Sequence, residues 1–377
     1  MRSYFGALVF YAVFTAIYGL GHWAIYLQAK ALIEPGPAGR FALMVFLSLM
    51  VIGPAAHGLA GRQTAWTAAV VYLWMGLAFY LLLASFIIFG VRSLGLERLA
   101  RPLGLGLLLA AVVLTSYGLL AARSPKVVYV PIRTDKLPAG VDRLEIAVLS
   151  DLHLYSVEAE ARLERVLKAM KRLRYDLLVS AGDIVDAGMS RKGWQALAEQ
   201  MNSLNPPLGK YAVMGNHEYF AERFDGPGIA EAFLKAAGFK VLRQELIKID
   251  GLIQLVGLDD PQFSRGSKTS SHSEPHLLSR ADPDLFVLLL KHQPLVEASS
   301  LGRFDLQLSG HTHGGQLWPW SLLVRLIYSG YVKGLYDLGS GSLLYVTPGA
   351  GTWGPPVRIG PGAEITLIRL VRGDDRG

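Results

Sequence analysis

Two kinds of sequence pattern predict two parts in this chain: a bundle of four transmembrane helices over 1–125 and an α/β domain over 126–377. The first part consists of long apolar runs separated by short polar connectors. In the second part, short β-rich runs alternate with amphipathic stretches, and five expected strands end in clusters of Asp, Asn, His and Gly. Functional sites in α/β folds collect beyond the carboxyl ends of strands, so these clusters predict a site at one edge of the fold.

The composition of the 377-residue chain agrees with this division. Hydrophobic residues make up 51% of it and the mean hydropathy is +0.33, values that are high for a soluble enzyme. Residues 1–125 hold eight Lys and Arg side chains and two acids, Glu34 and Glu97, so nearly all of the net charge of +7 lies there. The second part is close to neutral, which argues against nucleic-acid binding. The chain has no cysteine, which excludes disulfides, thiolate ligands and cysteine nucleophiles.

Four stretches are long and apolar enough to cross a bilayer, which takes roughly 20 residues. They cover about 4–28, 41–60, 66–90 and 102–122. Backbone polar groups in lipid must pair within their own segment, so we expect helices and a multi-pass protein of the cell membrane. The alternative for the first stretch is a cleaved signal peptide over 1–31, but its apolar run is long for one and Arg2 is its only initial charge.

The side of the membrane that the C-terminal part faces does not follow from the sequence. With four spans, the N-terminus and the C-terminal part lie on the same side of the membrane. The polar segments that flank the spans carry four basic residues on that side and five on the other. That difference is too small for the positive-inside rule. His22 and His57 lie within expected spans, where ionisable residues are candidates for function, with a helix–helix hydrogen bond as the alternative. No set of acids accompanies them to form an ion pathway.

The C-terminal part alternates expected strands with amphipathic stretches. The strands cover 143–150, 176–180, 210–214, 239–249, 252–258, 285–291, 304–308, 343–347 and 364–370, and residues 158–173 have helical periodicity. Five strands run into polar clusters: Asp151-Leu-His153, Gly182-Asp183, Gly215-Asn216-His217-Glu218, Lys291-His292-Gln-Pro294 and Gly310-His311-Thr-His313. Glycine at 182, 215 and 310 lets the backbone turn sharply beside a ligand.

The side chains in these clusters are typical of metal ligands. The candidates are Asp151, His153, Asp183, Asn216, His292, His311 and His313. Carboxylate, imidazole and amide without thiolate suit Mn, Fe or Zn in a catalytic site. Seven ligands are too many for one ion but suit two divalent ions that share a bridging carboxylate. Such a pair activates water and neutralises attacking and leaving oxygens, which suits hydrolysis of phosphate esters.

By these five clusters, with Asp186 following Asp183 in the second, the chain resembles the calcineurin-like metallophosphoesterases over roughly 145–370. The longer strings 291–294, 309–316 and 349–360 are similar to those of a membrane-associated bacterial branch, transmembrane proteins with a metallophosphoesterase domain. The resemblance implies a four-layer αββα sandwich with the site at its loop edge.

The resemblance also implies roles for individual residues. One ion would take Asp151, His153, Asp183 and His313, and the other Asp183, Asn216, His292 and His311, with Asp183 bridging. The catalytic residues would be Asp183 and His217, the latter not a ligand but the acid that protonates the leaving oxygen or steadies the phosphoryl group. Asp186 and Glu218 would orient neighbouring groups.

The implied substrate class is a phosphodiester or pyrophosphate near the membrane, such as lipid-linked UDP-2,3-diacylglucosamine. Some relatives that act on this lipid have Arg-Asp where this chain has His217-Glu218, which weakens the transfer of their substrate. Alternatives are a phosphomonoesterase or protein phosphatase with the same ligands, or a non-catalytic membrane scaffold. The expected partners are the bilayer and a phosphate ester, not nucleic acid, and the oligomeric state does not follow from the sequence.

Three further features near the clusters each admit two interpretations. The polar segment 259–282, with Arg265, Lys268, His272 and His276, is either a phosphate-holding cap or a solvated loop. The aromatic run 317–331 either lies on the bilayer or forms a buried helix. Arg358 either reaches a phosphate or forms a structural salt bridge.

Overall fold

A computed structural model describes residues 2–60, 65–154, 158–188, 191–260 and 273–373, except for the helical side chains of 2–11, 55–60, 65–66, 68 and 191. The chain divides into two compact units. One comprises Met1–Leu120 with Gly354–Val357, and the other Ala121–Trp353 with Arg358–Gly377.

The first unit consists of the long helices α1 (Arg2–Ile33), α2 (Pro37–Ala60), α3 (Ala65–Ser93) and α4 (Glu97–Ala122). Among the described residues, three segments are long and apolar enough to cross a membrane: Pro37–Pro54, Ala69–Ser93 and Glu97–Ala122. Three spans rather than the expected four are therefore supported. The first expected span, 4–28, lies in α1, whose side chains are described only from residue 12 onward.

His22 joins two helices of this unit. Its Nδ1 lies 2.9 Å from the carbonyl oxygen of Tyr18, and the indole N–H of Trp74 on α3 donates to its Nε2 at 2.7 Å. Both ring nitrogens therefore have partners, which favours the helix–helix hydrogen bond over an ion pathway. The side chain of His57 lies outside the described residues.

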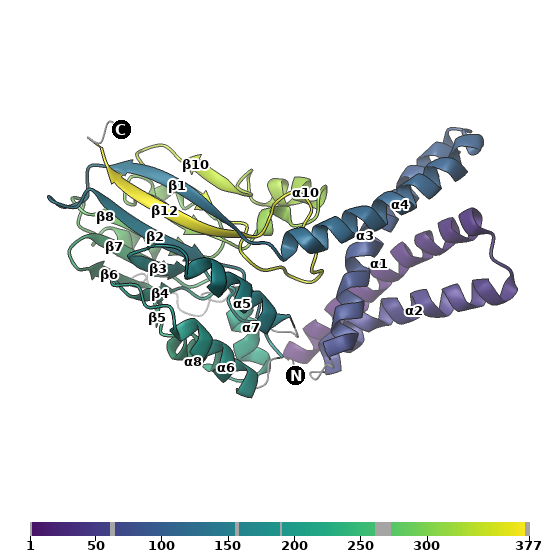
Figure 1. Ribbon diagram of the computed structural model, residues 1–377, viewed down its shortest axis with the longest axis horizontal. Helices are drawn as coiled ribbons and strands as arrows, with labels where there is room; N and C mark the ends of the chain where they lie inside the picture. The colour runs from purple at the N-terminus through teal and green to yellow at the C-terminus, as the bar shows by residue number, and fades with distance from the viewer. Residues whose placement is uncertain (1, 61–64, 155–157, 189–190, 261–272, 374–377) are drawn as a thin grey trace. The chain divides into compact units, whose positions relative to one another are not determined.

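The second unit is an α/β sandwich of two six-stranded sheets (Figure 1). The first has the order β1-β12-β2-β3-β4-β5, made of Lys126–Thr134, Glu364–Arg372, Arg143–Leu149, Leu177–Ser180, Lys210–Ala212 and Lys240–Val241. The second has the order β10-β11-β9-β8-β7-β6, made of Gly334–Asp337, Leu343–Val346, Leu306–Ser309, Phe286–Lys291, Ile253–Leu258 and Glu245–Ile249. Side chains such as Ile146, Val179, Leu255 and Leu288 fill the space between the sheets.

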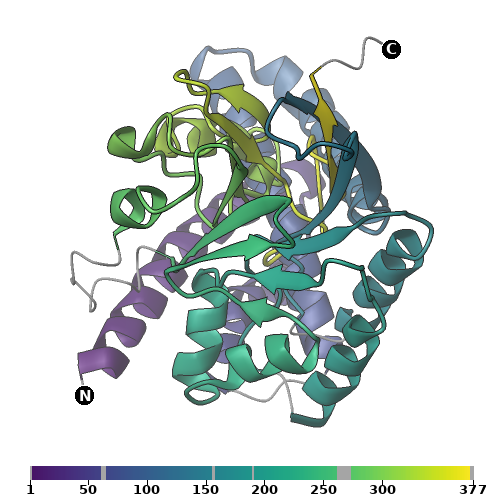
Figure 2. The same cartoon turned by 90° about the vertical axis from the view of Figure 1, so that its left-hand side faces the viewer.

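Helices cover the two outer faces unequally. The first sheet packs against α5 (Ala159–Met170), α6 (Arg191–Asn202) and α8 (Ile229–Ala236) through a large apolar core, and these helices lie together below the strands in the turned view (Figure 2). The second sheet is covered by the one-turn helix α9 (Glu274–Leu278) and neighbouring loops around Phe304. The expected helix over 158–173 is α5.

One expected strand is wrong. Residues 239–249 form two short strands, β5 and β6, which belong to different sheets. The chain turns between them at Gln244, whose φ is +50°. Strands β1 and β10 were not expected. Pro131 interrupts the pattern of β1, and the structure tolerates it because β1 is an edge strand.

The topology explains the position of the polar clusters. Strands β2, β3 and β4 run parallel in the first sheet, and β7, β8 and β9 run parallel in the second. The five strands that precede the clusters, β2, β3, β4, β8 and β9, therefore bring their carboxyl ends to one edge of the sandwich.

Candidate metal centre

Six of the seven candidate ligands form two compact groups at this edge. Asp151, His153 and His313 make one group, and Asp183, His292 and His311 make the other. Within each group the three possible ligand atoms all lie within 4.8 Å of one another. Asn216, the seventh candidate, is buried at the start of α7 (Asn216–Phe224) and contacts the second group.

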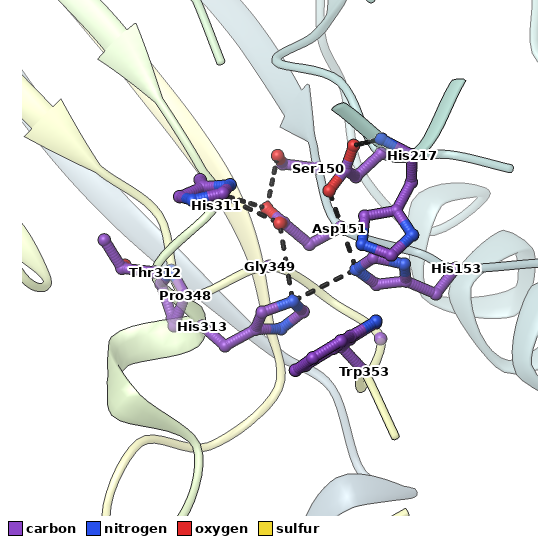
Figure 3. A network of polar contacts seen from close by, with 12 residues as sticks. Ser150, Asp151, His153, His217, His311, Thr312, His313, Pro348, Gly349 and Trp353 are labelled. Atoms are coloured by element: carbon purple, nitrogen blue, oxygen red, sulfur yellow. Dashed lines mark hydrogen bonds and ion pairs between the residues drawn. The ribbon is translucent and has the colours of Figure 1, made fainter. Parts of the chain in front are cut away.

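The first group presents ring nitrogens and a carboxylate to a common point. Nε2 of His153 and Nε2 of His313 lie 3.0 Å apart, and Asp151 Oδ1 is 3.6 Å from the latter (Figure 3). Asp186 lies 3.1 Å from Nδ1 of His153, which places the ring proton on Nδ1 and leaves a lone pair on Nε2. Nδ1 of His313 is buried without a hydrogen-bond partner among the described residues.

The second group is arranged around Nε2 of His292. Nδ1 of this ring donates to the carbonyl oxygen of Ala181 at 2.8 Å, so in the neutral ring Nε2 carries the lone pair. Asp183 Oδ2, Asn216 Oδ1 and His311 Nδ1 each lie 3.1 Å from that nitrogen. Oxygen and nitrogen lone pairs that converge in this way fit a bound cation, and the donor set suits a divalent metal without thiolate preference.

The pKa values of His292 and Asp183 also indicate that the second group favours positive charge. Burial alone lowers the pKa of His292, but the carboxylates of Asp183 and Asp151 outweigh it and raise the pKa to about 10. Burial raises the pKa of Asp183, but His292 and His217 outweigh burial and hold it well below its usual range. The site therefore favours positive charge beside an ionised Asp183.

Asp183 lies between the two groups. Its Oδ2 is 3.1 Å from His292 Nε2 and 3.9 Å from His153 Nε2. Its Oδ1 accepts from the backbone N–H of His217 at 2.9 Å, so the carboxylate has a fixed orientation. A carboxylate placed in this way is suited to contact cations in both groups.

The backbone holds five of the seven candidates in an uncommon conformation. Asp151, His153, Asp183, His311 and His313 have φ between +49° and +70°. Residues other than glycine adopt this left-handed region at a cost and concentrate there at functional sites. The strand ends thus bend sharply where the ligand side chains must point inward.

Two glycines are required because neighbouring segments approach the site closely. A Cβ at Gly215 would lie 2.2 Å from Asp183 Oδ1, and one at Gly310 would lie 2.2 Å from Asp151 Oδ2. Neither has a positive φ, so close approach, rather than the sharp turn expected from the sequence, explains them. Gly182 is required for both reasons, because its φ is +96° and a Cβ there would lie 2.8 Å from His292 Nδ1.

Glu218 supports the loop that carries Asp183. Its carboxylate is fully buried and accepts backbone N–H groups of Asp183, Ile184, Val185 and Gly215 at 2.6–3.1 Å. The expectation that Glu218 orients a neighbour is therefore correct, but it orients backbone rather than an imidazole.

Asp186 connects His153 with His217. Its two oxygens lie 3.1 Å from His153 Nδ1 and 2.7 Å from His217 Nδ1. Burial opposes ionisation of Asp186, but His217 and the hydrogen bonds from both rings lower its pKa to about 2. An ionised Asp186 thus fixes the orientation of both imidazoles, as the sequence predicts.

Replacing Asp186 with asparagine is expected to weaken binding of divalent metal by about 10–100-fold, the usual effect of removing a carboxylate behind a ligating imidazole. Titration of metal-depleted protein with Mn, followed by activity and by direct metal binding, measures the change. Asp225→Asn is the control, because among the described residues the Asp225 carboxylate accepts the backbone N–H of Gly188 and contacts no candidate ligand. Equal metal affinity in Asp186→Asn and the wild type would contradict this role.

Several contributors to the site carry no obvious sequence signal. Ser150 donates to Asp151 Oδ2 at 2.5 Å. Arg162 on α5 is buried and donates to the carbonyl oxygens of Leu152 and His153. The sequence hints at the inward direction of Arg162 only through its position on the apolar face of α5, beside Leu163.

Arg358 has neither of the two roles considered from the sequence. It is 1% exposed and donates to the carbonyl oxygens of Pro348, Gly349 and Gly351, with a longer contact to that of His313. Burial lowers its pKa to about 10, so it remains charged at neutral pH. Arg358 therefore holds the loop beneath the first group and does not reach outward.

The segment 259–282 is only partly described. Arg265, Lys268 and His272 lie outside the described residues, and His276 is exposed on α9. The cap interpretation of this segment stays a prediction.

Comparisons with known proteins agree with this geometry. A family model described as calcineurin-like phosphoesterase matches residues 144–315. An uncharacterized metallophosphoesterase of Aquifex aeolicus is 37% identical over 261 residues, which cover 69% of this chain and 97% of the relative. A transmembrane protein with metallophosphoesterase domain from Danio rerio is 34% identical over 70% of this chain and 61% of its own length, and one from Bos taurus is 31% identical over 74% and 65%. The chain thus spans less than two thirds of these two vertebrate relatives.

An α/β sandwich with two adjoining groups of Asp and His side chains that could each hold a metal ion has the architecture of a metal-dependent hydrolase. The chain belongs to the calcineurin-like metallophosphoesterases, and it is a metal-dependent phosphoesterase. The names of the vertebrate relatives and three helices able to cross a bilayer associate it with a membrane.

Proposed function

We propose that this chain is a multi-pass membrane enzyme with two divalent metal ions that hydrolyses a phosphodiester or pyrophosphate bond. Asp151, His153, Asp183 and His313 would hold one ion, and Asp183, Asn216, His292 and His311 the other. The position of Asp183 Oδ2 between His153 Nε2 and His292 Nε2 is the observation that carries this proposal. The donor set suits Mn, Fe or Zn.

The ions, when bound, would supply an activated water and neutralise charge on the phosphoryl oxygens. The chain's own residues orient these groups. Glu218 accepts the backbone N–H of Asp183, the backbone N–H of His217 donates to the Asp183 carboxylate, and Asp186 contacts Nδ1 of His153. The ligand side chains are thus preorganised by buried hydrogen bonds, which lowers the cost of reorganisation during reaction.

His217 is the proposed proton donor to the leaving oxygen. Its Nδ1 is engaged by Asp186 at 2.7 Å, and its side chain is 12% exposed. Its Nε2 has no hydrogen-bond partner among the described residues, so this nitrogen can face a substrate. A ring with one nitrogen fixed by a carboxylate and the other free is suited to general acid catalysis.

We propose a lipid-linked substrate, with UDP-2,3-diacylglucosamine as one example. The helices that can cross a bilayer support this class because they keep the enzyme where such substrates are found. The His217-Glu218 pair, which differs from Arg-Asp in some relatives that act on this lipid, weighs against a direct transfer of substrate. Glu218 is buried under the Asp183 loop, so the difference at that position affects the loop rather than a substrate contact.

The test uses the full chain in lipid nanodiscs, depleted of metal and then loaded with Mn, Fe or Zn. Hydrolysis of bis-p-nitrophenyl phosphate faster than p-nitrophenyl phosphate is expected. Preference for the monoester would instead support a phosphomonoesterase or protein phosphatase. No metal-dependent hydrolysis of either, with metal bound, would leave a non-catalytic scaffold and overturn the proposal.

We further propose that 1–125 forms the transmembrane domain and 126–377 the catalytic domain, with the cell membrane as the location. Protease protection of the full chain in oriented vesicles would determine which side the catalytic domain faces.

A further inference from the structure

Helix α10 (Trp320–Ile327) presents an unusually apolar surface. Six large apolar side chains on or next to this helix are exposed: Trp318, Trp320, Leu322, Leu323, Leu326 and Ile327, which we call the α10 face. Leu326 is 79% exposed and Trp318 is 59% exposed. Soluble proteins rarely expose such side chains contiguously, and a contiguous apolar patch usually marks an interaction surface.

The side chains of the α10 face lie on one side of the helix. At about 100° per residue, the positions of Trp320, Ile327, Leu323, Leu326 and Leu322 follow one another over an arc of roughly 160°. Outside this arc, Val324 lies about 40° beyond Trp320 and is the one buried residue of the helix, and Arg325 lies about 60° beyond Leu322. The sequence-based alternative of a buried helix is therefore wrong.

Arg325 is an exposed cation beside this apolar arc. Among the described residues, no carboxylate lies within ion-pair distance of it. A helix with an apolar face, flanking Trp side chains and a basic residue at its border matches the chemistry of a lipid interface, where aromatic rings lie at headgroup level and cations meet phosphate.

The α10 face is rigidly connected to the metal centre. The helix follows η4 (His313–Gly315), and a Cβ at Gly315 would lie 2.3 Å from the Cα of Ser321, so the two elements are tightly packed. At the other end, the ring of Tyr328 lies 5.4 Å from that of His311. Whatever contacts the α10 face is thereby held near the site.

The chain itself supplies a bilayer within reach. Three residues separate the end of the candidate span Glu97–Ala122 from the start of β1 at Lys126. A tether of this length keeps the second unit at a high effective concentration near the membrane, so modest affinity of the α10 face suffices for binding.

We propose that the α10 face docks into the interface of the bilayer that holds the transmembrane helices. Trp318 and Trp320 lie at headgroup depth, Leu322, Leu326 and Ile327 enter the acyl region, and Arg325 contacts lipid phosphate. The inference depends on the membrane location of the chain and not on the substrate proposed above.

The lack of cysteine in the chain permits a direct test. Full-length Leu326→Cys and Leu322→Cys variants carry a nitroxide label in vesicles of phosphatidylcholine and phosphatidylglycerol. Lys171→Cys, at the exposed end of α5, is the control. Circular dichroism verifies the folding of each variant, and loss of bis-p-nitrophenyl phosphate hydrolysis in folded variants would count against the proposed phosphodiester specificity without affecting the depth measurement.

Labels at 322 and 326 are expected to collide more with oxygen and less with a water-soluble nickel chelate, giving a collision ratio several-fold higher than at 171. Equal ratios at all three positions would overturn the proposal. Dipolar coupling between labels of two chains would also overturn it, because it indicates a second copy on this face. The same holds if the collision ratio rises only when a lipid substrate is added.

Discussion

Replacing Asp183 with asparagine is expected to lower kcat/KM by about 10³-fold or more, equivalent to about 4 kcal/mol of transition-state stabilisation. Asp183 lies within reach of both groups of ligands, 3.1 Å from His292 Nε2 and 3.9 Å from His153 Nε2. The substitution removes the shared charge while keeping the shape of the side chain. Metal content by mass spectrometry is expected to fall together with activity.

Glu145→Gln is the matched control for this change. Glu145 is also a buried carboxylate on β2, but it lies at the far end of the strand from Asp151 and pairs with Arg369 at 2.6 Å. It should keep its metal and most of its activity. If Asp183→Asn retained full activity, or if both variants lost activity equally, the bridging role would be wrong.

Replacing His217 with glutamine is expected to lower kcat by about 10²–10⁴-fold, the usual contribution of a positioned acid. Metal content should change little, because the ring of His217 lies beside His153 but its Nδ1 is engaged by Asp186 rather than by a candidate ligand. This separation of activity from metal content distinguishes His217 from the ligands. His276→Gln, an exposed histidine on α9, should behave as wild type.

A series of aryl phosphodiesters distinguishes proton donation from simple charge stabilisation by His217. Leaving groups with a low pKa need no proton, so the loss in His217→Gln should be smallest for p-nitrophenyl esters. It should grow for leaving groups that resemble alkoxides. A loss that is independent of the leaving group would contradict general acid catalysis by His217.

Much of the site could be predicted because strand ends carry it. The strands that precede Asp151, Asp183 and His292 are short apolar runs that end in polar residues, a pattern visible without the structure. Parallel pairing then brings these ends to one edge. The convergence of six candidate ligands in two groups therefore follows from local pattern and sheet topology together.

The remainder depends on long-range packing. Nothing adjacent to Arg358 in the sequence indicates that its guanidinium is enclosed by carbonyl oxygens of the 348–351 loop. Likewise, the run 239–249 has one apolar pattern, and only the separate demands of two sheets divide it at Gln244. Segments far away in the sequence determine whether a single cation such as Arg358 is buried and which strand a short strand pairs with. A local sequence pattern does not contain that information.

The atoms that converge around His292 Nε2 make the stability of the fold, as well as catalysis, depend on bound metal. These atoms come from segments far apart in the chain, so they meet only when the sandwich has folded. A ligand that binds the folded form alone adds to its stability, by about 2.7 kcal/mol at a concentration 100-fold above its Kd. We therefore expect the supply of metal to raise the fraction of folded chains as well as the activity of each.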